Sequence, residues 1–182
     1  MVIESAIYSF FADENALYFI TYYGEIYRVC NTKSECIISD ISSLDMVSFD
    51  GNTIYYINNS LELISYNVTT NQAEQLAGEF VKAIYYDGSR LLYSNKNGIY
   101  EMNVNDGSIK LLTEMTAERI SSDSTYITFY SNETLYLLND EVEILAHQRL
   151  LYFSVISDMN KVYYVYYDNG ENVSEIIEIW LV

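Results

Sequence analysis

One short unit repeats five times along the chain, and this repeat constrains the fold more than any other feature. An aspartate recurs with spacings of 37, 37, 36 and 35 residues, at Asp13, Asp50, Asp87, Asp123 and Asp158. Each aspartate has an apolar residue three positions before it, an aliphatic residue four after it and an aromatic residue six after it. Self-similarity at a fixed period of this length indicates an array of stacked structural repeats.

The spacing within each unit indicates β-strands joined by tight turns. Side chains four and six positions after the aspartate share one face of a strand, because strand side chains alternate with a period of two. The pairs Asp50-Gly51 and Asp87-Gly88 are typical of hairpin turns, since both residue types tolerate positive φ. Further turn sequences, such as Asn105-Asp106-Gly107-Ser108, divide each unit into four short strands.

Four short antiparallel strands in every repeat predict the blades of a β-propeller. The chain of 182 residues is therefore expected to be all-β, a single five-bladed β-propeller domain spanning residues 1–182. The blades are expected at about 1–40, 41–78, 79–114, 115–148 and 149–182. The last blade runs out at Trp180-Leu181-Val182, in its third strand, so it is expected to be incomplete.

The repeat resembles the Tyr-rich blade of the YWTD and TolB-like propellers. In those families the second strand reads Asp-x-x-x-[Ile/Leu/Val]-Tyr-[Phe/Tyr/Trp], and here it stands as Asp13–Phe19, Asp50–Tyr56 and Asp158–Tyr164. The resemblance covers nearly the whole chain and implies the fold rather than a function, because propellers serve as binding modules, scaffolds and enzymes alike. The Trp-Thr-Asp that names the YWTD family is absent, so the behaviour of its receptor ectodomains is not carried over.

The incomplete last blade leaves an open sheet edge. The residues Val2–Ser5 are the only ones left to patch the last blade. Otherwise Ser174–Val182 forms an edge strand guarded by Glu175 and Glu178, or an edge to which a partner or a second copy adds a strand.

Charge and composition limit the classes of partner. The chain has 26 acidic and 9 basic residues and a formal net charge of −17, which opposes binding to nucleic acids and to anionic membrane surfaces. Basic or neutral partners are expected: a protein, a small molecule or a sugar. No export signal or membrane-spanning run stands out, which favours the cytoplasm only weakly and leaves the localisation open.

The two cysteines, Cys30 and Cys36, lie on either side of a predicted short turn. The spacing permits a disulfide across a hairpin, whereas two small buried residues in a reducing compartment are the alternative. There is no CxxC pair or cysteine–histidine cluster, so neither a metal site nor a cofactor is expected.

One position of the repeat marks a candidate ligand site at the mouth of the central channel. Five residues before each aspartate, near the start of each innermost strand, the residue type differs from blade to blade; the positions are Tyr8, Asp45, Lys82, Glu118 and Phe153. Two carboxylates and a lysine near one axis would suit a polar ligand, or acid–base chemistry of the kind glycoside hydrolysis needs. Solvated strand ends are the alternative interpretation.

The other candidates for chemistry have structural explanations. A ring of five aspartates would suit cations, but a turn residue that accepts backbone hydrogen bonds explains the repeat better. His147 is the single histidine, and no serine or cysteine motif accompanies it, so no catalytic residue is assigned. Whether the protein is an enzyme stays open, with the balance against it.

Three functions fit these observations. The first is a non-catalytic module that presents the loops of an acidic propeller to a protein or a small ligand. The second is a lectin or a glycoside-active enzyme with Asp45 and Glu118 as carboxylates at the channel mouth. The third is an acidic decoy for a basic protein, whose binding would weaken steeply with salt.

Overall fold

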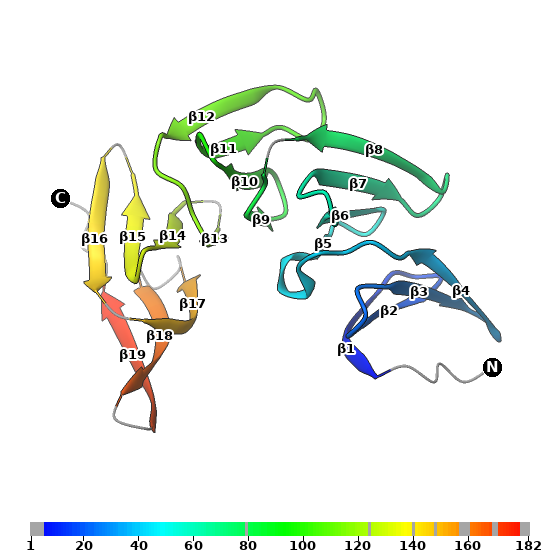
Figure 1. The fold of residues 1–182 in the computed structure, drawn as a ribbon, viewed down its shortest axis with the longest axis horizontal. Coiled ribbons are helices and arrows are strands. Elements are labelled where there is room, and N and C mark those ends of the chain that lie inside the picture. The colour runs from blue at the N-terminus through cyan, green and yellow to red at the C-terminus, as the bar shows by residue number, and fades with distance from the viewer. Residues whose placement is uncertain are drawn as a thin grey trace. The chain divides into compact units, whose positions relative to one another are not determined.

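The protein consists of antiparallel β-sheets in sequence order (Figure 1). The computed structural model describes residues 6–78, 80–123, 125–139, 141–147, 149–156, 161–168 and 171–178. Contacts divide the chain into two compact units, Met1–Ile84 and Tyr85–Val182, and the boundary falls within a strand. Each unit is described by itself.

The first two sheets, called blades 1 and 2, belong to the first unit. Blade 1 has the strand order β1-β2-β3-β4, and blade 2 has the order β5-β6-β7-β8. The strands are β1 Ile7–Ala12, β2 Leu17–Thr21, β3 Ile26–Cys30, β4 Lys33–Ile38, β5 Ser48–Phe49, β6 Thr53–Ile57, β7 Leu63–Asn67 and β8 Gln72–Ala77. A short 3-10 helix, Leu44–Met46, precedes β5.

The remaining three sheets are blades 3, 4 and 5. Blade 3 comprises β9 Ala83–Tyr86, β10 Leu91–Asn95, β11 Gly98–Met102 and β12 Ile109–Thr113. Blade 4 comprises β13 Arg119–Ser122, β14 Ile127–Ser131, β15 Thr134–Leu138 and β16 Val142–His147. Blade 5 has three strands in the part that the structure describes, β17 Leu150–Ile156, β18 Lys161–Asp168 and β19 Glu171–Glu178.

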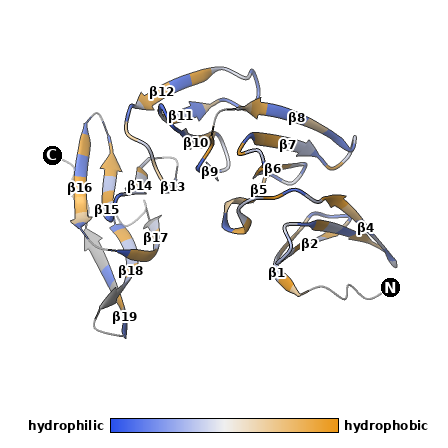
Figure 2. Cartoon of the chain, viewed as in Figure 1, coloured by the Kyte–Doolittle hydropathy of each residue, from blue (hydrophilic) through white to orange (hydrophobic). Residues whose placement is uncertain are grey.

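The strands lie where the repeat predicts them, because the strand segments and the turn sequences occur at the same places in each unit. Both apolar and polar residues occur along the fourth strands β12 and β16 (Figure 2), which are exposed or half-buried, whereas the second strands β10 and β14 are buried throughout. The predicted edge segment Ser174–Val182 lies in β19 as far as Glu178, and its last four residues are outside the described part. The single-domain boundary at 1–182 stays a prediction.

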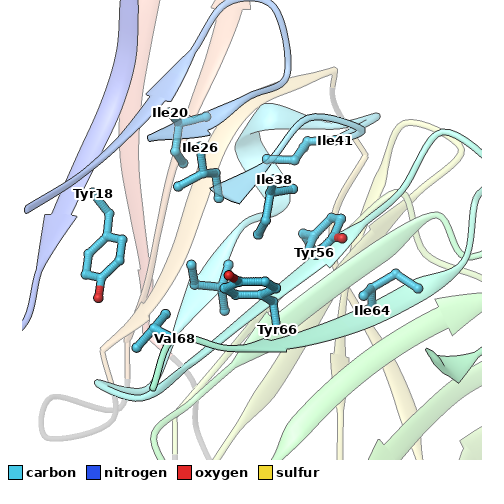
Figure 3. Close-up of a cluster of buried hydrophobic side chains, with 10 residues drawn as sticks. Tyr18, Ile20, Ile26, Ile38, Ile41, Tyr56, Ile64, Tyr66 and Val68 are labelled. Atoms are coloured by element: carbon cyan, nitrogen blue, oxygen red, sulfur yellow. The ribbon is translucent and has the colours of Figure 1, made fainter. Parts of the chain in front are cut away.

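The two faces of each blade have different roles, and we call them face A and face B. Face A carries the residues four and six positions after the repeating aspartate, and face B is the opposite side. In the first unit, face A of blade 2 packs on face B of blade 1. The buried cluster comprises Tyr18, Ile20, Ile26, Ile38 and Ile41 from the blade 1 side and Ile54, Tyr56, Ile64, Tyr66 and Val68 from blade 2 (Figure 3).

The same arrangement recurs in the second unit. Tyr126, Tyr130, Leu135 and Leu137 on face B of blade 4 form a buried cluster with Leu150, Phe153, Val162 and Tyr164 of blade 5. Every large buried aromatic side chain at such an interface removes about 150–250 Å² from water, which is the main stabilising contribution. The tyrosines of the repeat therefore serve the packing of one blade on the next.

Candidate functional site

The repeating aspartate closes the turn between the first two strands of a blade. In the four described units its Oδ1 accepts the backbone N–H groups two and three residues on: Asn15 and Ala16 for Asp13, Asn52 and Thr53 for Asp50, Ser89 and Arg90 for Asp87, and Thr125 and Tyr126 for Asp123. These bonds are 2.6–3.0 Å long. The turn interpretation is confirmed there, and Asp158 lies outside the described residues.

The second oxygen of the aspartate accepts a tyrosine hydroxyl in blades 1 and 2 and has other surroundings in blades 3 and 4. The hydroxyls of Tyr18 and Tyr55 donate to Oδ2 of Asp13 and Asp50 at 2.8 and 3.0 Å. Burial works against ionisation of Asp13, but the Asn15 N–H, the Tyr18 hydroxyl and the Ala16 N–H hold its pKa below the usual value. Burial and the Asp13 carboxylate raise the pKa of Tyr18, so its hydroxyl remains a donor.

An arginine replaces the tyrosine in blade 3. Position five after Asp87 is Leu92, and Arg90 donates instead, from Nε to Asp87 Oδ2 at 2.7 Å. The same guanidinium donates to Glu101 Oε2 at 2.8 Å and to the backbone oxygen of Asp123 at 3.1 Å. Burial opposes the charge on Asp87, whose side chain is 0% exposed, yet Arg90 keeps its pKa lowered. Arg90 thus links blades 3 and 4.

In blade 4 the corresponding oxygen has no donor in the part of the chain that the structure describes. Position five after Asp123 is Thr128, whose hydroxyl donates to the Ser121 backbone oxygen instead. Oδ2 of Asp123 is buried and has no hydrogen-bond partner among the described residues. The aspartates are therefore turn residues with variable second partners, and across the described residues no group of three His, Cys, Asp or Glu is placed to hold a metal ion.

The five predicted channel-mouth residues divide between the two units. Tyr8 lies in β1, Asp45 lies in the 3-10 helix before β5, and Lys82 directly precedes β9. Glu118 directly precedes β13, and Phe153 lies in β17. Four of the residues thus lie at or shortly before the start of a first strand, whereas Phe153 lies in the middle of β17, and their role at a channel mouth stays a prediction.

In the first unit the structure brings two of these residues together. The hydroxyl of Tyr8 donates to Oδ1 of the exposed Asp45, and this contact joins blade 1 to the connection that leads into blade 2. The ring of Tyr8 meets the ring of Tyr22 edge-to-face, with 5.3 Å between centroids. Tyr22 is 61% exposed and the neighbouring Tyr23 is 77% exposed. We call Tyr8, Tyr22, Tyr23 and Asp45 the tyrosine–aspartate patch.

The turn that carries Tyr22 and Tyr23 is fixed against its neighbour. Gly24 has φ +76°, and its carbonyl accepts the Ile41 N–H at 3.1 Å. A Cβ on Gly24 would lie 2.5 Å from the Ile41 carbonyl oxygen, so only glycine fits. The Tyr22 N–H donates to the Ala6 carbonyl at 3.2 Å. The two exposed tyrosines are therefore presented by a rigid turn.

Glu118 and Phe153 have other surroundings in the second unit. Oε1 of Glu118 accepts the Asn132 N–H at 3.4 Å, and its side chain lines a cleft of about 680 Å³ together with Arg119 and Arg149. Phe153 is 6% exposed and packs against the ring of Tyr130, so it is a core residue. Sequence position alone did not separate Phe153 from the polar members of the set.

The cysteines are exposed and free, so the predicted burial is wrong and no disulfide is present. The β3–β4 register pairs Cys30 with Lys33 and Cys36 with Tyr27, which places the two thiols at different levels of the hairpin. His147 is exposed at the end of β16, and its Nδ1 lies 3.1 Å from the Thr134 hydroxyl. Within the described part of the chain, no helix has the length and apolar character to cross a membrane.

Solved structures with the same arrangement of blades identify the architecture. The β-propeller domain of Cps50 (Swd1) from Myceliophteria thermophila aligns with 99% of this chain at a TM-score of 0.68 and 10% identity, over 73% of its own chain. The fold is a β-propeller. A chain of the nidogen/laminin complex aligns with 88% of this propeller at a TM-score of 0.64 and 15% identity, over 71% of its own length.

A designed protein shows the same likeness. Ika8 aligns with 97% of the propeller at a TM-score of 0.67 and 11% identity, and the propeller spans 59% of the Ika8 chain. The predicted five-bladed propeller with an incomplete last blade is thereby confirmed, as is the resemblance to propeller repeats. No protein-family model and no curated protein matches the sequence.

Proposed function

We propose that this propeller is a non-catalytic protein-binding module whose tyrosine–aspartate patch binds a basic segment of its partner. The observation that carries the proposal is that Tyr8 bonds to the exposed Asp45 and meets the exposed ring of Tyr22 edge-to-face, with the exposed Tyr23 next in the same turn. Tyrosine is enriched among the residues that dominate the binding energy of protein interfaces. A carboxylate beside exposed aromatic faces suits a lysine or arginine, through charge and cation–π attraction together.

The charge of the whole chain supports the same class of partner. A net charge of −17 accelerates encounters with a basic segment and disfavours acidic ones. One of the similar propeller chains comes from a complex of two proteins, nidogen and laminin. A protein partner is therefore the first candidate for this propeller too.

The test uses a lysine- and arginine-rich peptide and a glutamate-rich peptide of the same length as probes. We expect the basic peptide to bind and the acidic peptide to fail, by isothermal titration calorimetry on the full chain. Tyr22→Ala and Tyr23→Ala should each weaken binding about tenfold, because each removes a ring that stacks on a cation. Phe80→Ala is the matched control, since Phe80 is also an exposed ring, 59% exposed, and is not a member of the patch.

The two tyrosine variants separate this proposal from a purely electrostatic decoy. A decoy would lose the basic peptide steeply as salt rises and would be indifferent to the two tyrosine variants. If the patch binds the peptide, each tyrosine variant should weaken binding, and Asp45→Asn should weaken it as well. Binding that no patch variant changes would refute the proposal.

A carbohydrate ligand is the second candidate because exposed tyrosine rings next to a carboxylate also suit a sugar. Sugars are uncharged in most cases, so their binding would depend on Tyr22 and Tyr23 and would hardly change with salt. A glycan array probed with the wild type and with Tyr22→Ala distinguishes this candidate from the first.

A further inference from the structure

Four charged side chains line one cleft of the second unit, where blades 4 and 5 meet. The cleft has a volume of about 680 Å³, and the four residues are Glu118, Arg119, Glu133 and Arg149. Within the described part of the chain, none of them takes part in an ion pair. The other two arginines of this acidic chain each pair with a carboxylate, so the cleft brings together charges of both signs that have no partner in the described part.

The two arginines have N–H donors to offer a ligand. Arg119 begins β13, and its Nη1 donates to the backbone oxygen of Leu151 in β17 at 2.6 Å. That bond holds the guanidinium at the cleft and uses only one of its N–H donors. Arg149 is exposed and has no hydrogen-bond acceptor among the residues that the structure describes. Guanidinium groups suit the planar geometry of a carboxylate, which they bind through two parallel hydrogen bonds.

The two glutamates provide acceptors in the same cleft. Glu118 directly precedes β13, and its Oε1 accepts the Asn132 N–H at 3.4 Å. Its Oε2 has no partner in the part of the chain that the structure describes. Glu133 is exposed in the turn between β14 and β15, and its carboxylate likewise has no partner among the described residues. These oxygens can accept the N–H groups of an ammonium ion.

The rest of the lining is largely apolar and contains one buried hydroxyl. Tyr130 and Leu150 are buried, and Leu151 is 45% exposed. The hydroxyl of Tyr130 accepts the Leu150 N–H at 3.3 Å, and its own proton has no acceptor among the described residues. A concave site of this volume, with apolar residues and a few polar groups that fix orientation, is typical of small-molecule binding.

We propose that this cleft binds a small zwitterion with an apolar side chain, of the free amino acid or short peptide class. Arg119 and Arg149 bind its carboxylate, and Glu118 and Glu133 bind its ammonium group. The apolar side chain of the ligand contacts Leu151. The cleft belongs to the second unit and the tyrosine–aspartate patch to the first, so this site does not depend on the proposed binding of a basic segment.

The two signs of charge favour a zwitterion over ligands of a single sign. A phosphate ester or a dicarboxylate would meet the glutamates as well as the arginines, and the net charge of −17 opposes its approach. A polyamine would meet the two guanidinium groups. A ligand with one charge of each sign instead gives both pairs of side chains an opposite charge.

The experiment is isothermal titration calorimetry on the full chain with L-leucine and with the dipeptide Leu-Leu. We expect at least one of these zwitterions to bind, and comparison of the two distinguishes a single amino acid from a short peptide. N-acetyl-L-leucine lacks the ammonium group and L-leucinamide lacks the carboxylate. Each should bind about tenfold more weakly than the zwitterion, because it leaves one pair of charged side chains without a partner.

Two exposed residues of the cleft are tested by substitution. Arg149→Gln should weaken binding of the zwitterion but hardly change binding of L-leucinamide, and Glu133→Gln should weaken binding of the zwitterion but hardly change that of N-acetyl-L-leucine. Lys110→Gln is the matched control, since Lys110 is an exposed cation of the same unit that does not line this cleft. Circular dichroism checks that the variants fold.

Three results would each overturn the proposal. The first is that neither zwitterion binds. The second is that a capped form of leucine binds as tightly as the zwitterions do, which would mean that one end of the ligand is not recognised. The third is that Arg149→Gln and Glu133→Gln both bind the zwitterion as the wild type does.

Discussion

The hydroxyl of Tyr18 donates to Oδ2 of Asp13 at 2.8 Å, while Oδ1 of the same aspartate accepts two backbone N–H groups of its turn. One side chain therefore closes a turn and holds a buried tyrosine, which is 1% exposed, in its packing position. The repeat preserves the aspartate in every blade but varies the donor to its second oxygen. This variation makes the energetic role of the motif testable blade by blade.

Tyr18→Phe should destabilise the protein by about 1–2 kcal/mol, because it removes a hydrogen bond to a charged acceptor without creating a large cavity. The free energy of unfolding, from urea titration followed by tyrosine fluorescence or circular dichroism, measures the effect. Tyr23→Phe is the control, since Tyr23 is 77% exposed and its change should be within about 0.5 kcal/mol. Equal effects of the two substitutions would contradict the assigned role of the Tyr18 hydroxyl.

Arg90→Met should cost about 2–4 kcal/mol, because it leaves the fully buried Asp87 carboxylate without its cation. Part of the guanidinium is exposed, at 23%, so solvent moderates the loss. Lys110→Met is the matched control, because Lys110 is exposed on the outer strand β12 and should contribute less than about 0.5 kcal/mol. Thermal unfolding of both variants under the same conditions gives the comparison.

Asp123→Asn should be neutral or slightly stabilising, whereas Asp13→Asn should destabilise. Both substitutions keep an oxygen that can accept the backbone N–H groups of the turn. In blade 4 the change replaces a buried carboxylate oxygen that has no donor among the described residues. In blade 1 it removes the charged acceptor of the Tyr18 hydroxyl. The prediction fails if the two variants lose the same free energy of unfolding.

The free energy of unfolding should decrease on acidification, and Asp13 and Asp87 should account for part of this decrease. The pKa of each is lowered in the folded protein below the ordinary value of 3.8. A depressed pKa means that the carboxylate stabilises the fold above the ordinary value, and that this contribution is lost as the pH falls through the folded-state pKa. The wild type should therefore lose more stability between about pH 5 and pH 2 than Asp13→Asn/Asp87→Asn does.

Urea titrations across this pH range measure that difference. The double variant serves as its own control above about pH 5, where the gap from the wild type should be constant. If the free energies of unfolding of the two proteins changed in parallel over the whole pH range, the two carboxylates would not contribute to the pH dependence of stability.

Gly24→Ala should destabilise the first unit and disturb the tyrosine–aspartate patch. An alanine there would need a positive φ and would clash with the Ile41 carbonyl oxygen. Gly51→Ala is the matched control, because Gly51 also has a positive φ, +98°, but nothing lies within 4 Å of its added Cβ. The cost at Gly24 should exceed that at Gly51 by about 1 kcal/mol or more. Binding of the basic peptide should weaken only in Gly24→Ala.

The sequence predicts part of the candidate site. Of the residues five positions before each aspartate, Tyr8 and Asp45 meet through a hydrogen bond, whereas Phe153 lies inside its strand and is buried. Tyr22 and Tyr23 were recognisable as aromatic residues outside the repeat register. The sequence did not show that the turn carrying them is held rigidly, because this depends on the contact between Gly24 and Ile41 in the folded chain.

The sequence by itself determined the number of blades, their strands and the role of the repeating aspartate, because strand alternation and turn chemistry act over a few residues. Only the tertiary structure decided which oxygen of each aspartate has a partner, that Cys30 and Cys36 are exposed, and that Phe153 is buried. It also decided that Phe10 is exposed although its counterparts Ile84 and Ile120 are buried. A residue's place in the repeat assigns it to a face, but its burial depends on whether another sheet covers that face.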